Sequence, residues 1–461
     1  MDDPDALAPR RNHFSANEED FSRGKARRVR LRIEPARKQT SNTGIFKRWA
    51  FIVSMLFLFP FATQCQRLTP LAPKPDWSVL DQFQDTITHD EFVNLLNSVY
   101  APQGADPWIT IEPEKAVIQE NATDRFILRF AENTASKKPF PHYWSIHSGN
   151  STEQKPLNGL KIALDPGHLG GDWAKMEERW FQIGSAIPVV EGDMTLHVAQ
   201  LLAPQLRELG AEVDFVRSNP GPITDQRPNE LTKQAESSLQ DHGISQPLAT
   251  FSGPADPTKE SAVPWEAERL FYRVAEIRER AKIVNEKLKP DFTICLHFNA
   301  EPWGDPAHPT LVDKNHLHLL INGCYSRNEL GYDDVRYSML LKLLGRTFDS
   351  ELNLSEAVAD SMRQATNLPP YLYATPNAKQ IGNSEYVWAR NLIANRLYEC
   401  PVVYIEPYVM NSQEVFARVQ AGEYEGRHNF GGVMKRNIYA EYADAVADGL
   451  ANWARRNGGN R

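Results

Sequence analysis

Short apolar segments typical of buried strands alternate with amphipathic helical segments over most of the sequence after residue 158. The segments expected as strands are 160–164, 211–216, 292–296 and 401–405, and those expected as helices are 193–209, 266–288 and 438–453. Strands that alternate with helices build a mostly parallel sheet, because each helix carries the chain back to the start of the next strand. We therefore predict an α/β domain over residues 158–456, with a mostly parallel sheet flanked by helices.

Two stretches interrupt this alternation and are expected as insertions on the domain. Residues 218–264 are rich in Pro, Ser, Thr and Asp and are too long for an ordinary connection. Residues from about 340 to 378 have a largely helical pattern. The first insertion is either a lid over a functional site or a passive solvated loop, and its composition favours neither.

Residues 67–150, ahead of this domain, are predicted to form a small α+β module of unknown role. Its helix is expected at 88–100, with Phe92 and Val99 on one face. Its strand is expected at 124–130, where apolar and polar residues alternate. Nothing in these residues indicates chemistry.

The N-terminal segment 1–46 is polar and basic and lacks sustained apolar periodicity, so we expect it to be disordered. The segment 47–65 has an apolar core at 49–62 that suits a signal peptide and is short for a spanning helix, which needs about 20 residues. Cys65 lies where a lipid-modified cysteine would follow such a core, but Gln64 stands where a small residue is usual. We interpret 47–65 as a signal or anchor segment and expect an exported protein, with cleavage, anchoring and lipidation as open alternatives.

The formal net charge of −8 argues against a nucleic-acid partner, because such binding needs clustered cations and these lie mainly in the segment 1–46. The 4 cysteines, Cys65, Cys295, Cys324 and Cys400, have neither the spacing of a zinc ribbon nor that of a disulfide framework. A metal site in this chain must therefore use other side chains.

Histidine and carboxylate side chains stand where the predicted strands end. His168, His297 and Glu406 follow three of these strands, and Glu191 opens the first helix. Because the carboxyl ends of parallel strands lie at one edge of a sheet, we expect these side chains to lie close together. Two histidines and one carboxylate around a divalent ion, with a second carboxylate as a base, form a catalytic zinc site. Any one of the four alone is an ordinary loop residue, so only the combination indicates such a site.

Four blocks of residues, in a fixed order, carry a resemblance to a known family. They are Asp165-Pro166-Gly167-His168, then Glu191-Gly192-Asp193-Met194-Thr195-Leu196, then Arg280 and Asn285 ahead of His297-Phe298-Asn299-Ala300, and finally Val403-Tyr404-Ile405-Glu406 followed by Asn411. With these blocks the sequence resembles the zinc-dependent N-acetylmuramoyl-L-alanine amidases of bacterial cell walls over about residues 160–454.

The resemblance implies a zinc amidase/peptidase-like fold, zinc as the cofactor, and hydrolysis of the amide bond between N-acetylmuramic acid and L-alanine of the peptidoglycan stem peptide. It also implies that His168, Glu191 and His297 are the zinc ligands. Glu406 is then the catalytic carboxylate, which moves the proton of the attacking water. The protein is expected in the cell envelope, either in the periplasm or anchored to the membrane.

Five further polar residues lie in these blocks or shortly after them. Asp165 and Asn299 either orient an imidazole and tie strand ends together or are plain turn residues. His308, His316 and His318 follow His297, and the last two alternate on a strand-like run. We expect them as surface histidines, with a second metal or a substrate contact as the alternative.

The sequence departs from the family's pattern at two places near the expected site. The connection from His168 to Glu191 is longer than usual, and Pro407-Tyr408 replaces a Gly-Phe-like pair after Glu406. Both departures bear on substrate preference, since the four reacting side chains are present.

The expected partner is peptidoglycan or a soluble muropeptide. Membrane attachment through the N-terminal segment and an unidentified activator protein stay open. Two other functions compete: a zinc amidohydrolase that acts on soluble muropeptides, and an inactive wall-binding regulatory protein. The second is disfavoured, because a pure binder has no need for Glu406 beside a complete ligand set.

Overall fold

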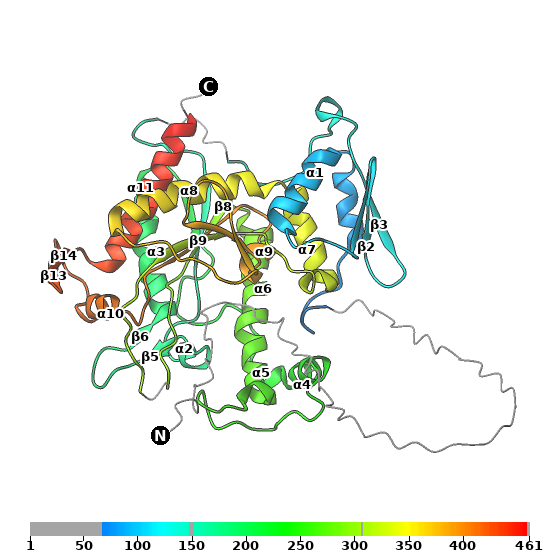
Figure 1. The fold of residues 1–461 in the computed structure, drawn as a ribbon. Coiled ribbons are helices and arrows are strands. Elements are labelled where there is room, and N and C mark those ends of the chain that lie inside the picture. The colour runs from blue at the N-terminus through cyan, green and yellow to red at the C-terminus, as the bar shows by residue number, and fades with distance from the viewer. Residues whose placement is uncertain (1–66, 147–151, 306–307, 459–461) are drawn as a thin grey trace, which may run out of the picture.

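The computed structural model describes residues 67–146, 152–305 and 308–458 (Figure 1). The segments 1–46 and 47–65, expected as a disordered segment and as a signal or anchor segment, lie outside the described residues. Within the described ranges, no helix is both long enough and apolar enough to span a membrane.

A seven-stranded sheet forms the centre of the molecule, with the strand order β10-β11-β9-β12-β8-β4-β7. Its strands are β4 (Lys161–Pro166), β7 (Glu212–Phe215), β8 (Phe292–Leu296), β9 (Leu317–Ile321), β10 (Ala378–Gln380), β11 (Val387–Arg390) and β12 (Val402–Pro407). β7, β4, β8 and β12 are parallel, whereas β9 pairs antiparallel with β12 and β10 pairs antiparallel with β11. β8 is buried along its whole length, as expected for a strand covered on both faces. The predicted α/β fold with a mostly parallel sheet is therefore confirmed.

Helices cover both faces of the sheet, which gives the domain three layers (Figure 1). One face is covered by α3 (Glu191–Glu208), α8 (Thr347–Thr366) and α11 (Ile438–Gly458), and α11 packs against the other two. A long helix approaches the other face, built from α5 (Val263–Arg269), η6 (Leu270–Ala275), α6 (Glu276–Lys282) and η7 (Ile283–Leu288). Its C-terminal part packs there with α9 (Ile393–Leu397). The long helix ends at Lys289, whose backbone is left-handed with φ 47°.

α8 lies in the central core of the domain. Its Leu354, Val358 and Met362 are fully buried in the cluster that includes the apolar side chains of β9, β12 and α11. The stretch from about 340 to 378 is helical as predicted, but α8 is one of the layers of the fold and not an addition to its surface. α7 (Asp333–Leu344) precedes it.

The stretch 218–264 contains α4 (Thr232–Asp241) and two short helical turns, η4 (Pro228–Glu230) and η5 (Lys259–Ser261). α4 packs against α5. Leu231 and Ala235 share a buried cluster with Leu270 and with Leu169, the residue after His168. This stretch is therefore packed close to the chain segment that carries His168.

The small α+β module predicted ahead of the domain is present (Figure 1). Its helical elements are η1 (Trp77–Phe83), α1 (His89–Leu95) and η2 (Leu96–Tyr100), and its antiparallel sheet contains β1 (Ile109–Glu112), β2 (Lys115–Gln119) and β3 (Arg125–Arg129). α1 begins with a capping box formed by Thr88 and Glu91. The core of the module is shared with the domain, because Phe92 and Leu128 pack with Met339 of α7.

Short elements complete the described chain. They are η3 (Thr134–Ser136), α2 (Trp173–Met176), β5 (Trp180–Phe181), β6 (Val189–Val190), η8 (Glu329–Gly331), α10 (Gln413–Gln420), β13 (His428–Phe430) and β14 (Val433–Lys435). β5 and β6 pair into a hairpin within the connection from His168 to Glu191.

Candidate metal centre

Three side chains from distant parts of the chain meet at the carboxyl ends of β4 and β8. His168 follows β4, His297 follows β8, and Glu191 is the first residue of α3. β4 and β8 are neighbouring parallel strands, so the residues that follow them lie at the same edge of the sheet. One ligand atom from each of the three lies within 4.8 Å of the others. Their side chains are at most 7% exposed.

Gly167 makes room for this cluster. An ideal Cβ on Gly167 would lie 2.2 Å from Cε1 of His297, so any larger residue would collide with the imidazole. His168 follows with a left-handed backbone, φ 59°, at the turn after β4. The Gly167 N–H donates to the Leu296 carbonyl at 2.8 Å, which joins the two strand ends.

The distances between the donor atoms suit a metal ion. Oε1 of Glu191 lies 3.4 Å from Nε2 of His168 and 3.5 Å from Nδ1 of His297. Ligand atoms at tetrahedral positions around zinc, with bonds near 2.1 Å, are roughly 3.4 Å apart. The residues present therefore fit a metal ion with two imidazole ligands and one carboxylate ligand.

Glu191 is held in its charged form by its neighbours. Burial raises the pKa of its carboxyl, but the charge of His168, the hydrogen bond from His297 and the charge of Arg179 together hold this pKa below its usual range. The backbone N–H of Phe298 also donates to Oε1 at 3.0 Å. This hydrogen bond fixes one oxygen of Glu191 beside the two imidazoles.

Glu406 lies on β12, the strand next to β8. Ile405 pairs with Leu296 and accepts a hydrogen bond from the His297 N–H at 3.1 Å, so Glu406 is the neighbour of His297 across the two strands. Tyr404, two residues before Glu406 and on the same face of β12, stacks on the His297 ring at 4.4 Å. Glu406 is 8% exposed. The structure therefore brings it to the edge of the sheet that carries the His-Glu-His group.

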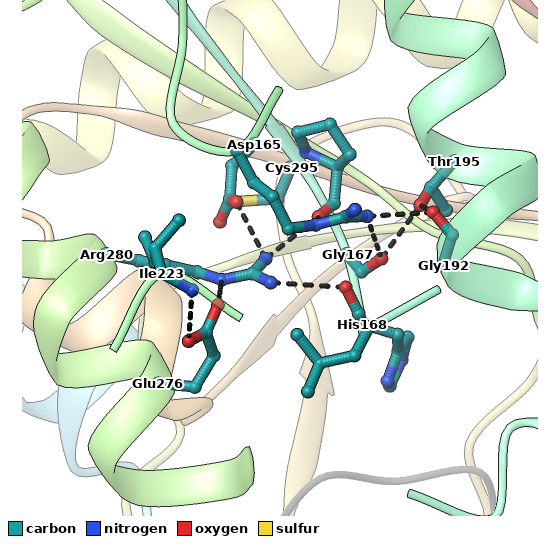
Figure 2. A network of polar contacts seen from close by, with 12 residues as sticks. Asp165, Gly167, His168, Gly192, Thr195, Ile223, Glu276, Arg280 and Cys295 are labelled. Atoms are coloured by element: carbon teal, nitrogen blue, oxygen red, sulfur yellow. Dashed lines mark hydrogen bonds and ion pairs between the residues drawn. The ribbon is translucent and has the colours of Figure 1, made fainter. Parts of the chain in front are cut away.

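Asp165 takes part in a buried network of polar contacts with Arg280 (Figure 2). It accepts a hydrogen bond from Arg280 at 2.9 Å and one from the Tyr398 hydroxyl at 2.5 Å. Arg280 also donates to the His168 carbonyl at 3.1 Å and pairs with Glu276 at 3.0 Å. Asp165 is thus linked to the backbone of His168 through Arg280.

Asn299 joins the ends of β8 and β12. Its backbone N–H donates to the Tyr408 carbonyl at 2.9 Å, and its carbonyl accepts from Met410 at 2.8 Å. Its side chain accepts from the backbone N–H of Ala300 at 2.7 Å. Asn299 is therefore a structural link between two strand ends.

The prediction of surface histidines is wrong for His316 and His318, which are 7% and 2% exposed. They lie at the start of β9 between two other strands, and His318 is directly opposite Glu406. Nε2 of His318 lies 3.0 Å from the Tyr373 hydroxyl. Burial lowers the pKa of His316 to about 4. Only His308 is exposed, as expected, beside Asp305.

Sequence reasoning missed two residues that contact the ligands. The carboxylate of Glu177 lies 2.7 Å from Nδ1 of His168, and Nε of Arg179 lies 3.4 Å from Glu191. Both residues lie on the connection from His168 to Glu191. The unusual length of this connection is the one feature of the sequence that could have pointed to them.

A small pocket of about 30 Å³ opens beside the ligands, with His168, His297 and Arg179 in its wall. Such a volume has room for about two water molecules. The same pocket is lined by Asp165 and Arg280, so it lies on the side of the buried network.

No protein-family model and no curated protein matches the sequence. Among solved structures, an N-acetylmuramyl-L-alanine amidase of Mycobacterium smegmatis is similar with 17% identity and a TM-score of 0.35, over 65% of this chain and 98% of that one. An amidase of Nostoc punctiforme is similar with 16% identity and a TM-score of 0.33, over 67% of this chain and 100% of that one. A Clostridioides difficile amidase, solved in complex with a lipoprotein, is 12% identical with a TM-score of 0.35, over 65% of this chain and 100% of that one. The first two are named as N-acetylmuramoyl-L-alanine amidases and the third as an amidase.

Proposed function

We propose that this protein is a zinc-dependent N-acetylmuramoyl-L-alanine amidase, which hydrolyses the amide bond between N-acetylmuramic acid and the first residue of the peptidoglycan stem peptide. The observation that carries the proposal is the buried His168-Glu191-His297 group, in which Oε1 of Glu191 lies 3.4 and 3.5 Å from the two imidazole nitrogens, close to the spacing of ligands around tetrahedral zinc. Support for Glu406 comes from its position on β12 directly after Ile405, which pairs with the last residue of β8 before His297. The order of the four sequence blocks supports the choice of this amide bond.

Each residue of the group has a separate task in the proposed reaction. A bound zinc ion supplies Lewis acidity, which polarises the amide carbonyl and makes water acidic enough to attack it near neutral pH. His168, Glu191 and His297 hold the ion. Glu406 accepts the proton of the attacking water on its carboxylate and returns it to the nitrogen of the departing L-alanine.

The proposal includes the place where the enzyme acts. Peptidoglycan lies outside the cytoplasmic membrane, and the apolar run at 49–62 has the length of a signal-peptide core. We propose export to the cell envelope, with 47–65 as the signal or anchor segment and 158–456 as the catalytic domain. Membrane attachment through the N-terminal segment and an activating partner protein are part of the same proposal.

The test combines metal content with product analysis. The purified protein is assayed for zinc, incubated with purified peptidoglycan, and followed by mass spectrometry for released stem peptides with a free L-alanine amine. Glu406→Gln should keep zinc and release no peptide. Glu208→Gln, which changes an exposed carboxylate on α3, should behave like the parent protein.

Three results would each contradict a part of the proposed function. Cleavage of soluble muropeptides without cleavage of intact peptidoglycan would replace the proposal with the narrower amidohydrolase. Zinc-independent binding to the wall without cleavage would favour a regulatory protein. Equal activity of Glu406→Gln and the parent would remove Glu406 from the reaction.

A further inference from the structure

We propose that Glu177 is a positioning residue of the metal centre, whose carboxylate holds His168 by Nδ1 so that Nε2 is the atom presented to the metal ion. This inference rests on the proposed function, because it takes the His-Glu-His group to be a metal site. It assigns a task to the long connection from His168 to Glu191.

Both oxygens of the Glu177 carboxylate are engaged on one side of His168. Oε1 lies 2.7 Å from Nδ1 of His168, and Oε2 accepts the backbone N–H of Leu169 at 2.7 Å. The Glu177 side chain is 8% exposed, and that of His168 is 7% exposed. The carboxylate therefore fixes the ring of His168 and the backbone that follows it at the same time.

This contact selects the tautomer of His168. Oε1 of Glu177 faces Nδ1 at 2.7 Å, so Nδ1 donates to this oxygen and the neutral ring keeps its lone pair on Nε2. Nε2 is also the nitrogen that faces Oε1 of Glu191, at 3.4 Å. A carboxylate behind a metal-binding histidine orients the ring and makes it a better ligand.

The backbone around Glu177 is held in place by its own hydrogen bonds. Glu177 follows α2, and its N–H donates to the Trp173 carbonyl at 3.2 Å. The chain then reverses through Glu178, which has a left-handed backbone with φ 56°. The backbone N–H of Arg179 donates to the carbonyl of the buried Ala174 at 2.8 Å. Glu177 is therefore fixed in a tight turn.

The same connection also reaches the second ligand. Trp180 of β5 pairs with Val190 of β6, the residue just before Glu191, and the Glu191 N–H donates to the Arg179 carbonyl at 3.2 Å. The Arg179 side chain faces Oε2 of Glu191 at 3.4 Å, on the oxygen that does not face the imidazoles. The connection thus contacts both ligands, through Glu177 at His168 and through Arg179 at Glu191.

The test is the zinc affinity, measured on the full-length protein by competition with a chelator of known affinity. Loss of an outer hydrogen-bond partner of a ligand typically weakens metal binding about 10- to 100-fold. Glu177→Ala should show a loss of this size. Glu177→Gln should lose less, because its amide oxygen still accepts from Nδ1 of His168. Asp172→Ala, which removes a 99% exposed carboxylate on the same connection, should bind zinc like the parent.

Two further measurements keep the result unambiguous. Thermal unfolding of the zinc-free proteins checks that Glu177→Ala is folded, and if it is not, Glu177→Gln decides. The visible spectrum of the cobalt-substituted proteins should change in the Glu177 variants, since it reports the geometry of the ligands. If the folded Glu177 variants have the zinc affinity and cobalt spectrum of the parent, the positioning role of Glu177 is wrong and the proposed metal centre is unaffected. A parent protein that binds no zinc would overturn the proposed metal centre itself.

Discussion

At the scale of single residues, Gly167 lies against the ring of His297 in the metal centre. The backbone of Gly167 lies where a side chain would enter the imidazole ring, with the ideal Cβ 2.2 Å from Cε1 and 2.4 Å from Nε2 of His297. Such distances cannot be relieved by a small adjustment, because the ring is itself stacked on Tyr404 at 4.4 Å. The position therefore requires glycine for a steric reason.

We expect Gly167→Ala to lower zinc affinity by at least about 100-fold. This is the upper end of the loss that follows removal of a hydrogen-bond partner of a ligand. The added methyl group displaces His297, which is one of the three ligands. Gly221→Ala is the matched control, because its nearest contact would be Asn219 at an ordinary 3.5 Å. Chelator competition measures both variants, and a Gly167→Ala protein with unchanged affinity would show that His297 is not a ligand.

The residues of the His-Glu-His group could be predicted from the sequence because each stands at the end of a strand or the start of a helix. Glu177 could not, since its approach to His168 depends on a tight turn and a two-residue hairpin that no periodic pattern announces. His316 and His318 were misplaced for a different reason. Alternating polar and apolar residues usually mark a half-exposed strand, but β9 lies inside the sheet with both faces covered.

At the scale of elements, α7 and α8 are joined by an ion pair that is out of contact with water. Lys342 of α7 lies 2.6 Å from Glu351 of α8, and the two side chains are 1% and 0% exposed. Lys342 also donates to the carbonyls of Tyr398 and Cys400, and Glu351 accepts the N–H of Val402. The pair therefore fixes two helices against the start of β12.

Glu351→Ala should lower the free energy of unfolding by about 3–5 kcal/mol, because it leaves the charge of Lys342 buried without a partner. Urea unfolding followed by circular dichroism measures this loss. In the double variant Lys342→Met with Glu351→Leu, no buried charge remains, so most of the stability should return. Glu279→Ala, in a partly exposed pair with Lys282 at 3.9 Å, should change stability by less than about 1 kcal/mol. A loss no larger in Glu351→Ala than in this control would contradict the expectation.

At the scale of the whole molecule, metal binding is expected to stabilise the fold, because its ligands come together only in the folded chain. Free zinc at about 100 times its Kd should add about 2.7 kcal/mol to the free energy of unfolding. Thermal unfolding with zinc and with EDTA should therefore differ by several degrees in the parent protein. The same comparison in His168→Ala should show a much smaller difference, and equal shifts in both would place the stabilising zinc elsewhere.

The sequence predicts the helices and strands of the layers better than it predicts strand direction and the packing between distant parts of the chain. The alternation of strands and helices identifies the parallel part of the sheet, which includes β4, β8 and β12. It says nothing of the reversed direction of β9, because the direction of a strand leaves no mark on its apolar pattern. It also divides the chain at about residue 150, whereas the side chains of the small module pack with α7, far along the chain.

α7 contacts both the N-terminal module and the catalytic domain. On one side its Met339 belongs to the core of the N-terminal module, and on the other its Lys342 holds the carbonyl of Tyr398, whose hydroxyl holds Asp165. A disturbance of the module therefore reaches the network under His168 through one rigid helix and two hydrogen bonds. The module and the catalytic domain are accordingly expected to melt in a single calorimetric transition, as one cooperative unit, and a gene fragment that began at the domain boundary would encode an exposed apolar surface on α7.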